Sequence, residues 1–318
     1  MTASAPKIRN AVRPWLEKFE AGDCVIVAVS GGADSLALAY ALSIEAKKLA
    51  IEVHAVTVDH QLQSISAAQA TKVVEQLLSL GIATTIEKVV VNITDGLEAS
   101  ARTARYEALN NVSSKIGAVA IFLGHTQDDQ AEGVLLGLAR GSGTRSLSAM
   151  APHKGIYIRP LLSITRSETE NVCDEVGMTP WYDPHNKDSS FARVRVRTQA
   201  LPALEDAIGP GISLALARSA ELLRHDADAL DEWAEQEAAA LDLSDLDCAH
   251  LENLPKAIRS RIIRIAIYAA GAPGGSVTAD HVGAVEALIC SWNGQGEAHV
   301  PGGVKVGRFS GRLSLLHH

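Results

Sequence analysis

Several features that would place a protein in a special class are absent from this sequence. No run of about 18 apolar residues occurs in it, so we expect no segment that crosses a membrane. Residues 1–9 do not lead from a charged segment into an apolar one, and we therefore predict no secretory signal. The 4 cysteines form no CxxC pair, which excludes a sequence-local zinc ribbon and a thioredoxin-type motif. We therefore expect the protein to work in the reducing environment of the cytoplasm.

Aromatic residues are also scarce. They make up 4% of the 318 residues, too little for stacking platforms along a long single strand of RNA. Hydrophobic residues reach 47% and charged residues 21%, while Gly and Pro number only 25 and 11. This composition excludes disordered, collagen-like and low-complexity chains, and it predicts a globular protein whose length suits two domains.

Acidic residues outnumber basic ones, and the formal net charge is −8. The excess is local, because residues 221–252 contain eleven acidic residues and one basic residue and carry −10 by themselves. Residues 253–318, with seven basic and three acidic residues, carry +4. We interpret the acidic run as a solvated helix face, and the remaining charge leaves room for a local basic surface.

Strand and helix patterns alternate four times in the first part of the chain. Short β-branched apolar runs are typical of buried parallel strands, and each is followed by residues at helical spacing. This alternation predicts an α/β fold in which a parallel, Rossmann-like sheet carries helices on both faces. The expected strands are 24–29, 51–58, 83–91 and 118–123, and the expected helices are 34–49, 65–80, 97–116 and one that begins near Thr126.

The pattern is less regular after residue 141. A helix is expected over 165–176 and a long polar loop over 179–190, a length that usually has a functional reason. We divide the chain into a first domain at 1–210, a helical acidic connector at 211–246 and a small α+β domain at 247–318. The later elements are expected to be helices at 211–241, 255–270 and 278–291, and strands at 297–300, 304–309 and 312–316.

The strongest motif is the stretch SGGADS at residues 30–35, which joins the first expected strand to its helix. Glycines let the backbone approach a ligand closely, and free N–H groups at a helix start attract an anion. The stretch lacks the lysine of a Walker A loop and does not match GxGxxG. We interpret it as a phosphate-binding loop; the alternative is an ordinary Gly-rich turn with a Ser or Asp N-cap.

This loop resembles the PP-loop of the N-type ATP pyrophosphatases, which cleave ATP between its α and β phosphates. The loop alone does not choose among the GMP, NAD and argininosuccinate synthetases, the tRNA thiolation enzymes and the tRNA(Ile)-lysidine synthases. Further motifs, in matching order and spacing, resemble the tRNA(Ile)-lysidine synthase family specifically. They are VDHQLQ at 58–63, EASARTARY at 98–106, GHTQDDQAE at 124–132, LARGSG at 138–143, RPLL at 159–162 with Arg166, WYDPHNKD at 181–188, RVRVR at 193–197 and LP at 201–202, with weaker matches at 254–255 and 300–303.

Three positions depart from the family pattern. Gln63 stands where the family usually has Arg, so no phosphate or RNA contact is assigned to it. Gly133 replaces a usual Thr, and His185 stands where Ser is common. None of the three belongs to the 30–35 loop or to the acidic residues of the 124–132 motif.

The resemblance implies a cytoplasmic, ATP-dependent, RNA-binding ligase that acts in tRNA processing. Such an enzyme adenylates the C2 carbonyl oxygen of the wobble cytidine in a tRNA(Ile) with a CAU anticodon. The ε-amine of free L-lysine then displaces AMP and gives lysidine. The catalytic PP-loop domain would be 1–210, and 247–318 would recognise the tRNA. Two alternatives remain, a tRNA sulfur-transferring PP-loop enzyme, which the absence of CxxC disfavours, and a non-catalytic RNA-binding protein with a degenerate ATPase fold.

The acidic motif at 124–132 has a reading of its own. Its polar residues at 125, 128, 129 and 132 are spaced to share one face of the expected helix. That face would begin at the carboxyl end of a strand, where open α/β sheets bind ligands, and carboxylates there suit Mg²⁺ that bridges phosphate oxygens. The alternative is that the two aspartates merely complement a helix N-terminus.

The expected site residues fall into four groups. Catalysis is expected of Asp34, His125, Asp128 and Asp129, and Mg²⁺ binding of Asp34, Asp128, Asp129 and Glu132. ATP, the co-substrate, is expected to contact Ser30, Gly31, Gly32, Ala33, Asp34, Ser35, Asp59 and His60. The tRNA backbone is expected to contact Arg102, Arg105, Arg193, Arg195 and Arg197, although the first two could also face the α-phosphate or only solvent. No membrane partner is expected, and the oligomeric state is left open, with a homodimer as one option.

Overall fold

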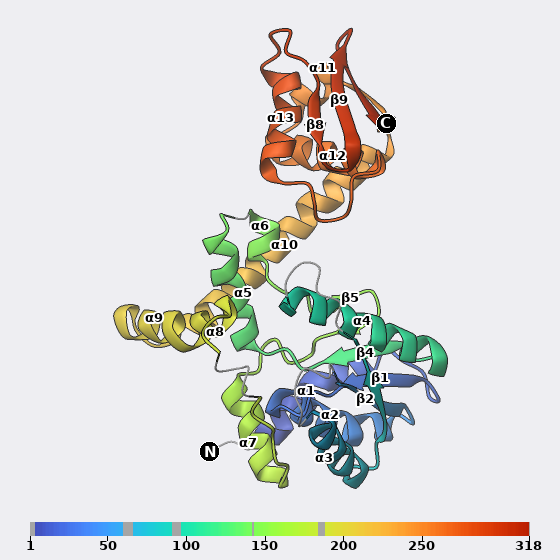
Figure 1. Ribbon diagram of the computed structural model, residues 1–318, viewed down its shortest axis with the longest axis vertical. Helices are drawn as coiled ribbons and strands as arrows, with labels where there is room; N and C mark the ends of the chain where they lie inside the picture. Colours follow the sequence, from blue (N-terminus) through green and yellow to red (C-terminus); the bar gives the residue numbers. More distant parts are fainter. Residues whose placement is uncertain (1–3, 60–65, 91–96, 142, 184–187, 318) are drawn as a thin grey trace. The chain divides into compact units, whose positions relative to one another are not determined.

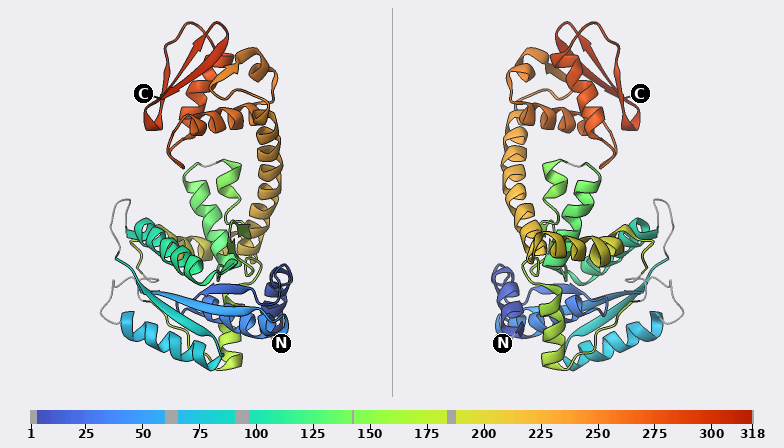
Figure 2. Two further views of the ribbon diagram at one scale, coloured as in Figure 1. Left: turned by 90° about the vertical axis from the view of Figure 1, so that its right-hand side faces the viewer. Right: turned by 90° about the vertical axis from the view of Figure 1, so that its left-hand side faces the viewer.

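The computed structural model describes residues 4–59, 66–90, 97–141, 143–183 and 188–317. Contacts divide the chain into two compact units, Met1–Leu223 and Arg224–His318 (Figures 1 and 2). The division falls within one long helix, α10 (Ile212–Ala239), so the predicted connector contributes to both units. The three-segment organisation itself stays a prediction. Across the described ranges, no helix has the length and apolar character needed to cross a membrane.

The first unit is built on a mostly parallel sheet, which confirms the predicted fold class. Among the described residues its strands follow the order β3-β2-β1-β4-β6-β5. The first five of these strands pair in parallel, whereas β5 and β6 form an antiparallel hairpin that the sequence pattern did not predict. The strands are β1 (Cys24–Ala28), β2 (Glu52–Asp59), β3 (Ala83–Lys88), β4 (Ala120–Leu123), β5 (His153–Lys154) and β6 (Tyr157–Ile158).

Helices cover both faces of this sheet, as predicted. Side chains alternate along each strand, so Val25 and Val27 of β1 join one core while Ile26 joins the other. The first core contains residues of α1, α2, α3 and α7, and the second contains residues of α4 (Figure 1). The helices of this unit before α10 are α1 (Ser4–Leu16), α2 (Ala33–Lys48), α3 (Ser66–Ser79), α4 (Leu97–Ile116), α5 (Gln127–Ala139), α6 (Thr144–Leu147), α7 (Arg166–Val176), α8 (Ala192–Arg195), the π-helical η2 (Val196–Ala200) and α9 (Leu201–Ile208).

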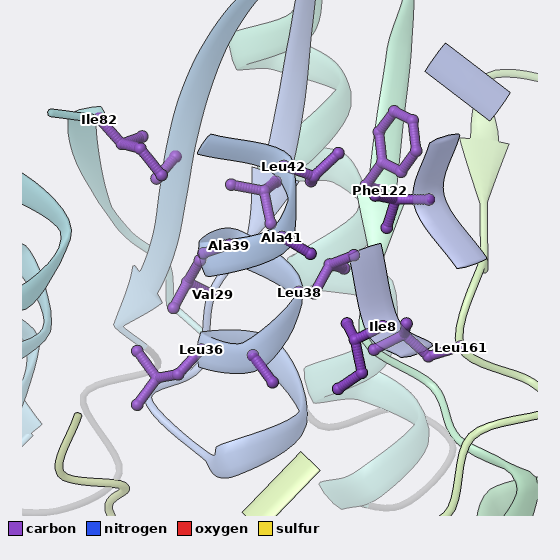
Figure 3. Close-up of a cluster of buried hydrophobic side chains, with 14 of the residues drawn as sticks. Ile8, Val29, Leu36, Leu38, Ala39, Ala41, Leu42, Ile82, Phe122 and Leu161 are labelled. Carbon is purple, nitrogen blue, oxygen red and sulfur yellow. The ribbon is translucent and has the colours of Figure 1, made fainter. Parts of the chain in front are cut away.

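The central helix α2 is buried on several sides, which explains its continuous apolar sequence. Leu38 and Leu42 are fully buried and lie near Phe122 of β4 and Ile8 of α1 (Figure 3). Phe122 in turn contacts Phe19 edge-on, with ring centroids 6.5 Å apart. Because α2 is enclosed by sheet and helices, its first residues are held in a fixed position at the end of β1.

The carboxyl ends of β1 and β4 lie next to each other in the sheet, at the point where the strand order reverses. After β1 the chain proceeds to β2 and β3 on one side, and β4 then pairs with the other side of β1. Open α/β sheets bind ligands at such a position. Gly124, directly after β4, approaches the start of α2 so closely that a Cβ there would lie 3.0 Å from the backbone carbonyl carbon of Asp34. Glycine at this position therefore permits the two loops to meet.

The second unit combines part of α10 with a small antiparallel sheet, in agreement with the predicted α+β domain. Among its described residues, the strands follow the order β7-β10-β9-β8. Ala234 and Ala238 of α10 are buried in its core together with Leu246 and Ile262. Its elements are β7 (Asp245–Asp247), α11 (Cys248–Asn253), α12 (Lys256–Ala269), α13 (Ala279–Cys290), β8 (Ala298–Val300), η3 (Pro301–Gly303), β9 (Val304–Phe309) and β10 (Arg312–His317).

Most basic side chains of this unit have partners inside it. Arg259 pairs with Glu286 at 2.9 Å, and Arg261 pairs with Asp231 at 2.5 Å. Arg312 pairs with Asp245 at 2.7 Å. Part of the positive charge counted over 253–318 is therefore balanced by carboxylates within the same unit.

The sequence patterns did not predict helix α1, which a buried carboxylate of α2 holds in place. Glu45 of α2 is 2% exposed, and it accepts hydrogen bonds from Arg9 at 2.6 Å and Arg13 at 3.1 Å, both in α1. Lys48 donates to the same carboxylate at 2.9 Å. Although burial alone would raise it, the hydrogen bonds from Lys48, Arg13 and Arg9 lower the pKa of Glu45 to about 2.

We predict that Glu45→Gln lowers the free energy of unfolding by about 2 kcal/mol at pH 7, because charge-assisted hydrogen bonds to a buried carboxylate are lost. The folded-state pKa lies below the unfolded value, so this stabilisation is complete above pH 5 and is lost as the pH falls toward 2. Chemical denaturation at several pH values measures it. Glu17→Gln, at an exposed position of the same region, is the control; an equal loss in both variants would contradict the prediction.

Candidate functional site

The 30–35 loop is braced by its own serine hydroxyl. The Ser35 hydroxyl donates to the Gly32 carbonyl at 2.9 Å and accepts from the Ser30 N–H at 3.2 Å. Gly31 has φ +88°, which only glycine adopts without strain. Helix α2 begins at Ala33 and its N-cap, Gly32, provides no side-chain hydrogen bond. The N–H groups of the first turn are therefore left to an external acceptor, as an anion site requires.

Asp34, the fifth residue of this loop, contacts two residues of α7. Its carboxylate accepts a hydrogen bond from the Thr169 hydroxyl at 2.5 Å and lies 3.6 Å from the Arg166 guanidinium. Burial raises the pKa of Asp34 to about 6, although Arg166 and Thr169 partly oppose the shift and the Asp129 carboxylate adds to it. The carboxylate therefore changes charge close to neutral pH.

Arg166, the first residue of α7, joins carboxylates from two other helices. Its guanidinium lies 3.6 Å from Asp34, 3.3 Å from Asp129 and 3.7 Å from Glu132. Its backbone N–H donates to Asp128 at 2.8 Å. Burial alone would lower the pKa of Arg166, but the carboxylates around it raise the pKa above its ordinary value. We call Arg166, Asp34, Asp129 and Glu132 the Arg166 cluster.

Glu132 is fully buried and holds two further arginines. Arg197 contacts it with two donors, at 2.6 and 3.1 Å, and Arg193 lies 3.6 Å away. Arg193 and Arg197 are four residues apart in the helical stretch formed by α8 and η2, and so reach the same carboxylate. Arg195 points elsewhere and donates to the Ser189 and Ser190 carbonyls, both at 2.7 Å. The stretch that carries these three arginines is therefore helical.

The start of α5 differs from the prediction in one respect. The helix begins at Gln127 with Thr126 as N-cap, so His125 precedes it and does not share a helical face with Asp128, Asp129 and Glu132. The Thr126 N–H donates to Asp129 at 2.8 Å in a capping box. Asp129 is buried, and although burial opposes it, Arg166 and the Thr126 N–H lower the pKa of Asp129. The helix-terminal role that we weighed as an alternative therefore applies to Asp129.

The carboxylates that were predicted to bind a metal contact arginines and do not converge on one common point. In the part of the chain that the structure describes, no three His, Cys, Asp or Glu side chains are grouped as a metal site would need. Glu132 has no exposed surface and uses both oxygens on Arg197. Metal binding by these residues stays a prediction, and Asp34, which belongs to the 30–35 loop itself, is the carboxylate that best fits it.

A second group of arginines surrounds His125. Burial lowers the pKa of His125 to about 3, the neighbouring Asp129 opposes the shift, and Arg159, Arg105 and Arg102 strengthen it. The ring is therefore neutral at pH 7. Its Nδ1 atom is buried and has no hydrogen-bond partner among the described residues, as is also true of Arg159 Nε.

Tyr106 connects these arginines. Its hydroxyl lies 3.3 Å from Arg102 and 3.4 Å from Arg159, and the Arg105 guanidinium lies 5.8 Å from its ring centroid. Among the side chains that the structure describes, no carboxylate pairs with these three arginines. Guanidinium groups that gather without carboxylates suit an anionic ligand.

The remaining predicted residues are placed less completely. Asp59 is buried at the end of β2, one strand from the loop. His60, Gln63 and His185 lie outside the described residues. Thr169 was missed in the sequence, and no local signal could have found it, because it meets Asp34 from 135 residues away.

Comparison with known proteins gives consistent results for both units. Residues 2–204 match the family model of a PP-loop domain, and residues 246–314 match that of the TilS substrate binding domain. The chain is 48% identical to a tRNA(Ile)-lysidine synthase of Thermobifida fusca, over 96% of this chain and 95% of the relative. It is 50% identical to one of Streptomyces coelicolor, over 92% and 84%.

A solved structure resembles the fold at lower identity. The U34-tRNA thiolase NcsA from Methanococcus maripaludis has a TM-score of 0.58 and 21% sequence identity, over 70% of this chain and 79% of that chain. This likeness shows a shared fold and carries no statement about the reaction.

We predict that Asp34→Asn stabilises the protein at pH 7 but not at pH 4. The folded-state pKa of Asp34, about 6, exceeds the unfolded value, so the folded state loses stability as the pH rises from 4 through 6. Asparagine keeps the shape and the acceptor for Thr169 but does not ionise. Thermal unfolding of both proteins across this pH range measures the difference. Asp174→Asn, at an exposed position of α7, is the control; a pH-independent difference for Asp34→Asn would refute the shift.

Proposed function

The chain belongs to the tRNA(Ile)-lysidine synthase family, and we propose that it makes lysidine at the wobble cytidine of a tRNA(Ile) with a CAU anticodon. In this reaction the C2 carbonyl oxygen of the cytidine attacks the α-phosphorus of ATP, the bond to the β-phosphate breaks, and diphosphate leaves. The ε-amine of free L-lysine then attacks C2, and AMP leaves. The observation that carries the proposal is the uncapped start of α2 behind the braced 30–35 loop, next to the carboxyl end of β4.

The chain's own groups would act mainly by positioning and by balancing charge. The loop and the first turn of α2 offer N–H donors to the diphosphate that leaves. The Ser30 hydroxyl, 3.4 Å from Ser35, is a further donor at the same loop. Arg102, Arg105 and Arg159 lack carboxylate partners among the described residues and suit the phosphates of tRNA or the α-phosphate.

Mg²⁺ is proposed as a cofactor of this site. It would take one or two carboxylates and complete its shell with phosphate oxygens and water. Asp34 fits because burial holds its pKa at about 6, so that a cation beside it would favour the ionised form. When bound, the ion would neutralise charge on the phosphates of ATP. Asp128, whose carboxylate accepts only a backbone hydrogen bond in the contacts described above, is the second candidate.

The partners follow from the same proposal. ATP and free L-lysine are the small substrates, and the tRNA is the nucleic-acid partner. We propose that 247–318 takes part in recognising the tRNA, in line with the substrate-binding family that matches there. A cytoplasmic location agrees with these substrates and with 4 cysteines that are free in the structure. Sulfur transfer is not favoured, since the relatives are lysidine synthases.

Asp34→Ala tests the assignment of the loop. We expect it to abolish ATP–diphosphate exchange and the incorporation of labelled lysine into tRNA(Ile), because the charge at the mouth of the loop is lost. The wild-type protein must show both activities with a CAU-anticodon transcript and not with a CAU-anticodon tRNA(Met). Glu17→Ala is the folded control. Normal exchange by a folded Asp34→Ala protein would show that this loop does not bind ATP as proposed.

Arg102→Ala tests the tRNA surface. We expect weaker tRNA binding and a salt dependence reduced by about one unit of slope, as for the loss of one phosphate contact, with unchanged ATP affinity. Binding titrations at several salt concentrations measure both quantities. Lys115→Ala, on the same helix and near Glu87 at 3.8 Å, is the matched control. If ATP affinity falls instead, Arg102 faces the nucleotide.

A further inference from the structure

A segment remote in sequence contacts the 30–35 loop through the backbone. Residues 179–181 follow α7, and the Trp181 N–H donates to the Gly31 carbonyl at 2.8 Å. A Cβ on Gly31 would lie 3.8 Å from the Trp181 Cβ, so the two backbones pass close to each other. The Gly31–Gly32 peptide is therefore held from outside the loop.

This contact fixes the direction of a donor. In a trans peptide the N–H points opposite to the C=O. Because the Gly31 carbonyl faces Trp181, the Gly32 N–H points away from the 179–181 segment. A peptide between two glycines has little steric resistance to rotation, so without an external partner it could turn its carbonyl toward the anion. A carbonyl oxygen at that position would repel phosphate.

The 179–181 segment is itself held by one side chain of α3. The Gln76 amide accepts from the Thr179 N–H at 2.8 Å and donates to the Thr179 carbonyl at 3.2 Å. One amide side chain thus satisfies both backbone groups of a residue 103 positions away. The side chain of Thr179 is exposed, so the backbone of this residue is held by the Gln76 amide and not by burial of its own side chain.

We propose that Gln76 is a positioning residue for phosphate binding, which acts through the 179–181 segment to keep the Gly31–Gly32 peptide in its anion-binding orientation. The proposal rests on the proposed function, because it takes the 30–35 loop as the site of the diphosphate. Gln76 does not touch the loop's donors. Its two hydrogen bonds set the position of Thr179, and the Trp181 N–H, two residues later, sets the Gly31 carbonyl.

The test compares Gln76→Leu with the wild-type full-length chain. Leucine is similar in size but makes neither hydrogen bond, and we expect affinities for ATP and for inorganic diphosphate to fall by a common factor on the order of ten. The affinity for adenosine, measured by competition with ATP, should stay unchanged, because only the phosphate cradle is affected. A loss caused by general loosening of the nucleotide site would lower the adenosine affinity as well.

Two further variants complete the design. Glu75→Leu alters the neighbouring exposed position of α3 and should leave all three affinities unchanged. Gln76→Glu keeps the acceptor for the Thr179 N–H but loses the donor, so an intermediate loss is expected; it also carries the test if Gln76→Leu does not fold. Wild-type affinity for ATP and diphosphate in the folded Gln76 variants would overturn the inference alone. A wild-type protein that binds neither ligand would defeat the proposed function as well.

Discussion

The arrangement of the site depends on the burial of carboxylates around Arg166. Glu132 has no exposed surface and Asp129 is buried, and an ionised carboxylate in such a position is costly unless cations and hydrogen bonds surround it. Arg166 lies within 3.3 to 3.7 Å of Asp34, Asp129 and Glu132, which come from α2 and α5. The helix that follows β1, the helix that follows β4 and α7 therefore cannot shift independently without leaving a buried charge unpaired.

The need to neutralise buried carboxylates also determines which arginines of the site contact the protein itself. Arg193 and Arg197 neutralise Glu132, and Arg195 binds carbonyls, so these side chains are occupied by the protein itself. Arg102 and Arg105 lie near the neutral His125, and no carboxylate pairs with either of them among the described side chains. Five arginines were predicted to bind tRNA. Of these, Arg102 and Arg105 keep a positive charge that is available to an external anion. Two arginines of the RxRxR pattern thus take part in an internal ion-pair network, and the contact of this stretch with tRNA stays a prediction.

Local sequence patterns predicted those strands and helices whose positions depend on the burial of their own residues. The strands β1, β2 and β4 and the helices α2 and α4 begin and end within a few residues of expectation, and α5 begins one residue from its expected start. Continuous apolar runs and helical spacing predict these elements because they record burial directly. Helix α1 was missed because it contains Pro14 and charged residues, and it is held by Glu45 from another helix. His125 was assigned to a helix because spacing alone does not show where the N-cap lies.

The features of the site that the sequence patterns did not predict depend on contacts between residues far apart in the sequence. The SGGADS motif identifies the loop, but the state of its groups depends on partners that no window of sequence contains. Thr169 and Arg166 influence the charge of Asp34, and Trp181 sets the Gly31 carbonyl. A glycine-rich loop gains close approach to phosphate at the expense of a defined conformation. The conformation of such a loop must therefore be fixed by the surrounding fold. Here hydrogen bonds from α7 and from the segment that follows it fix the loop.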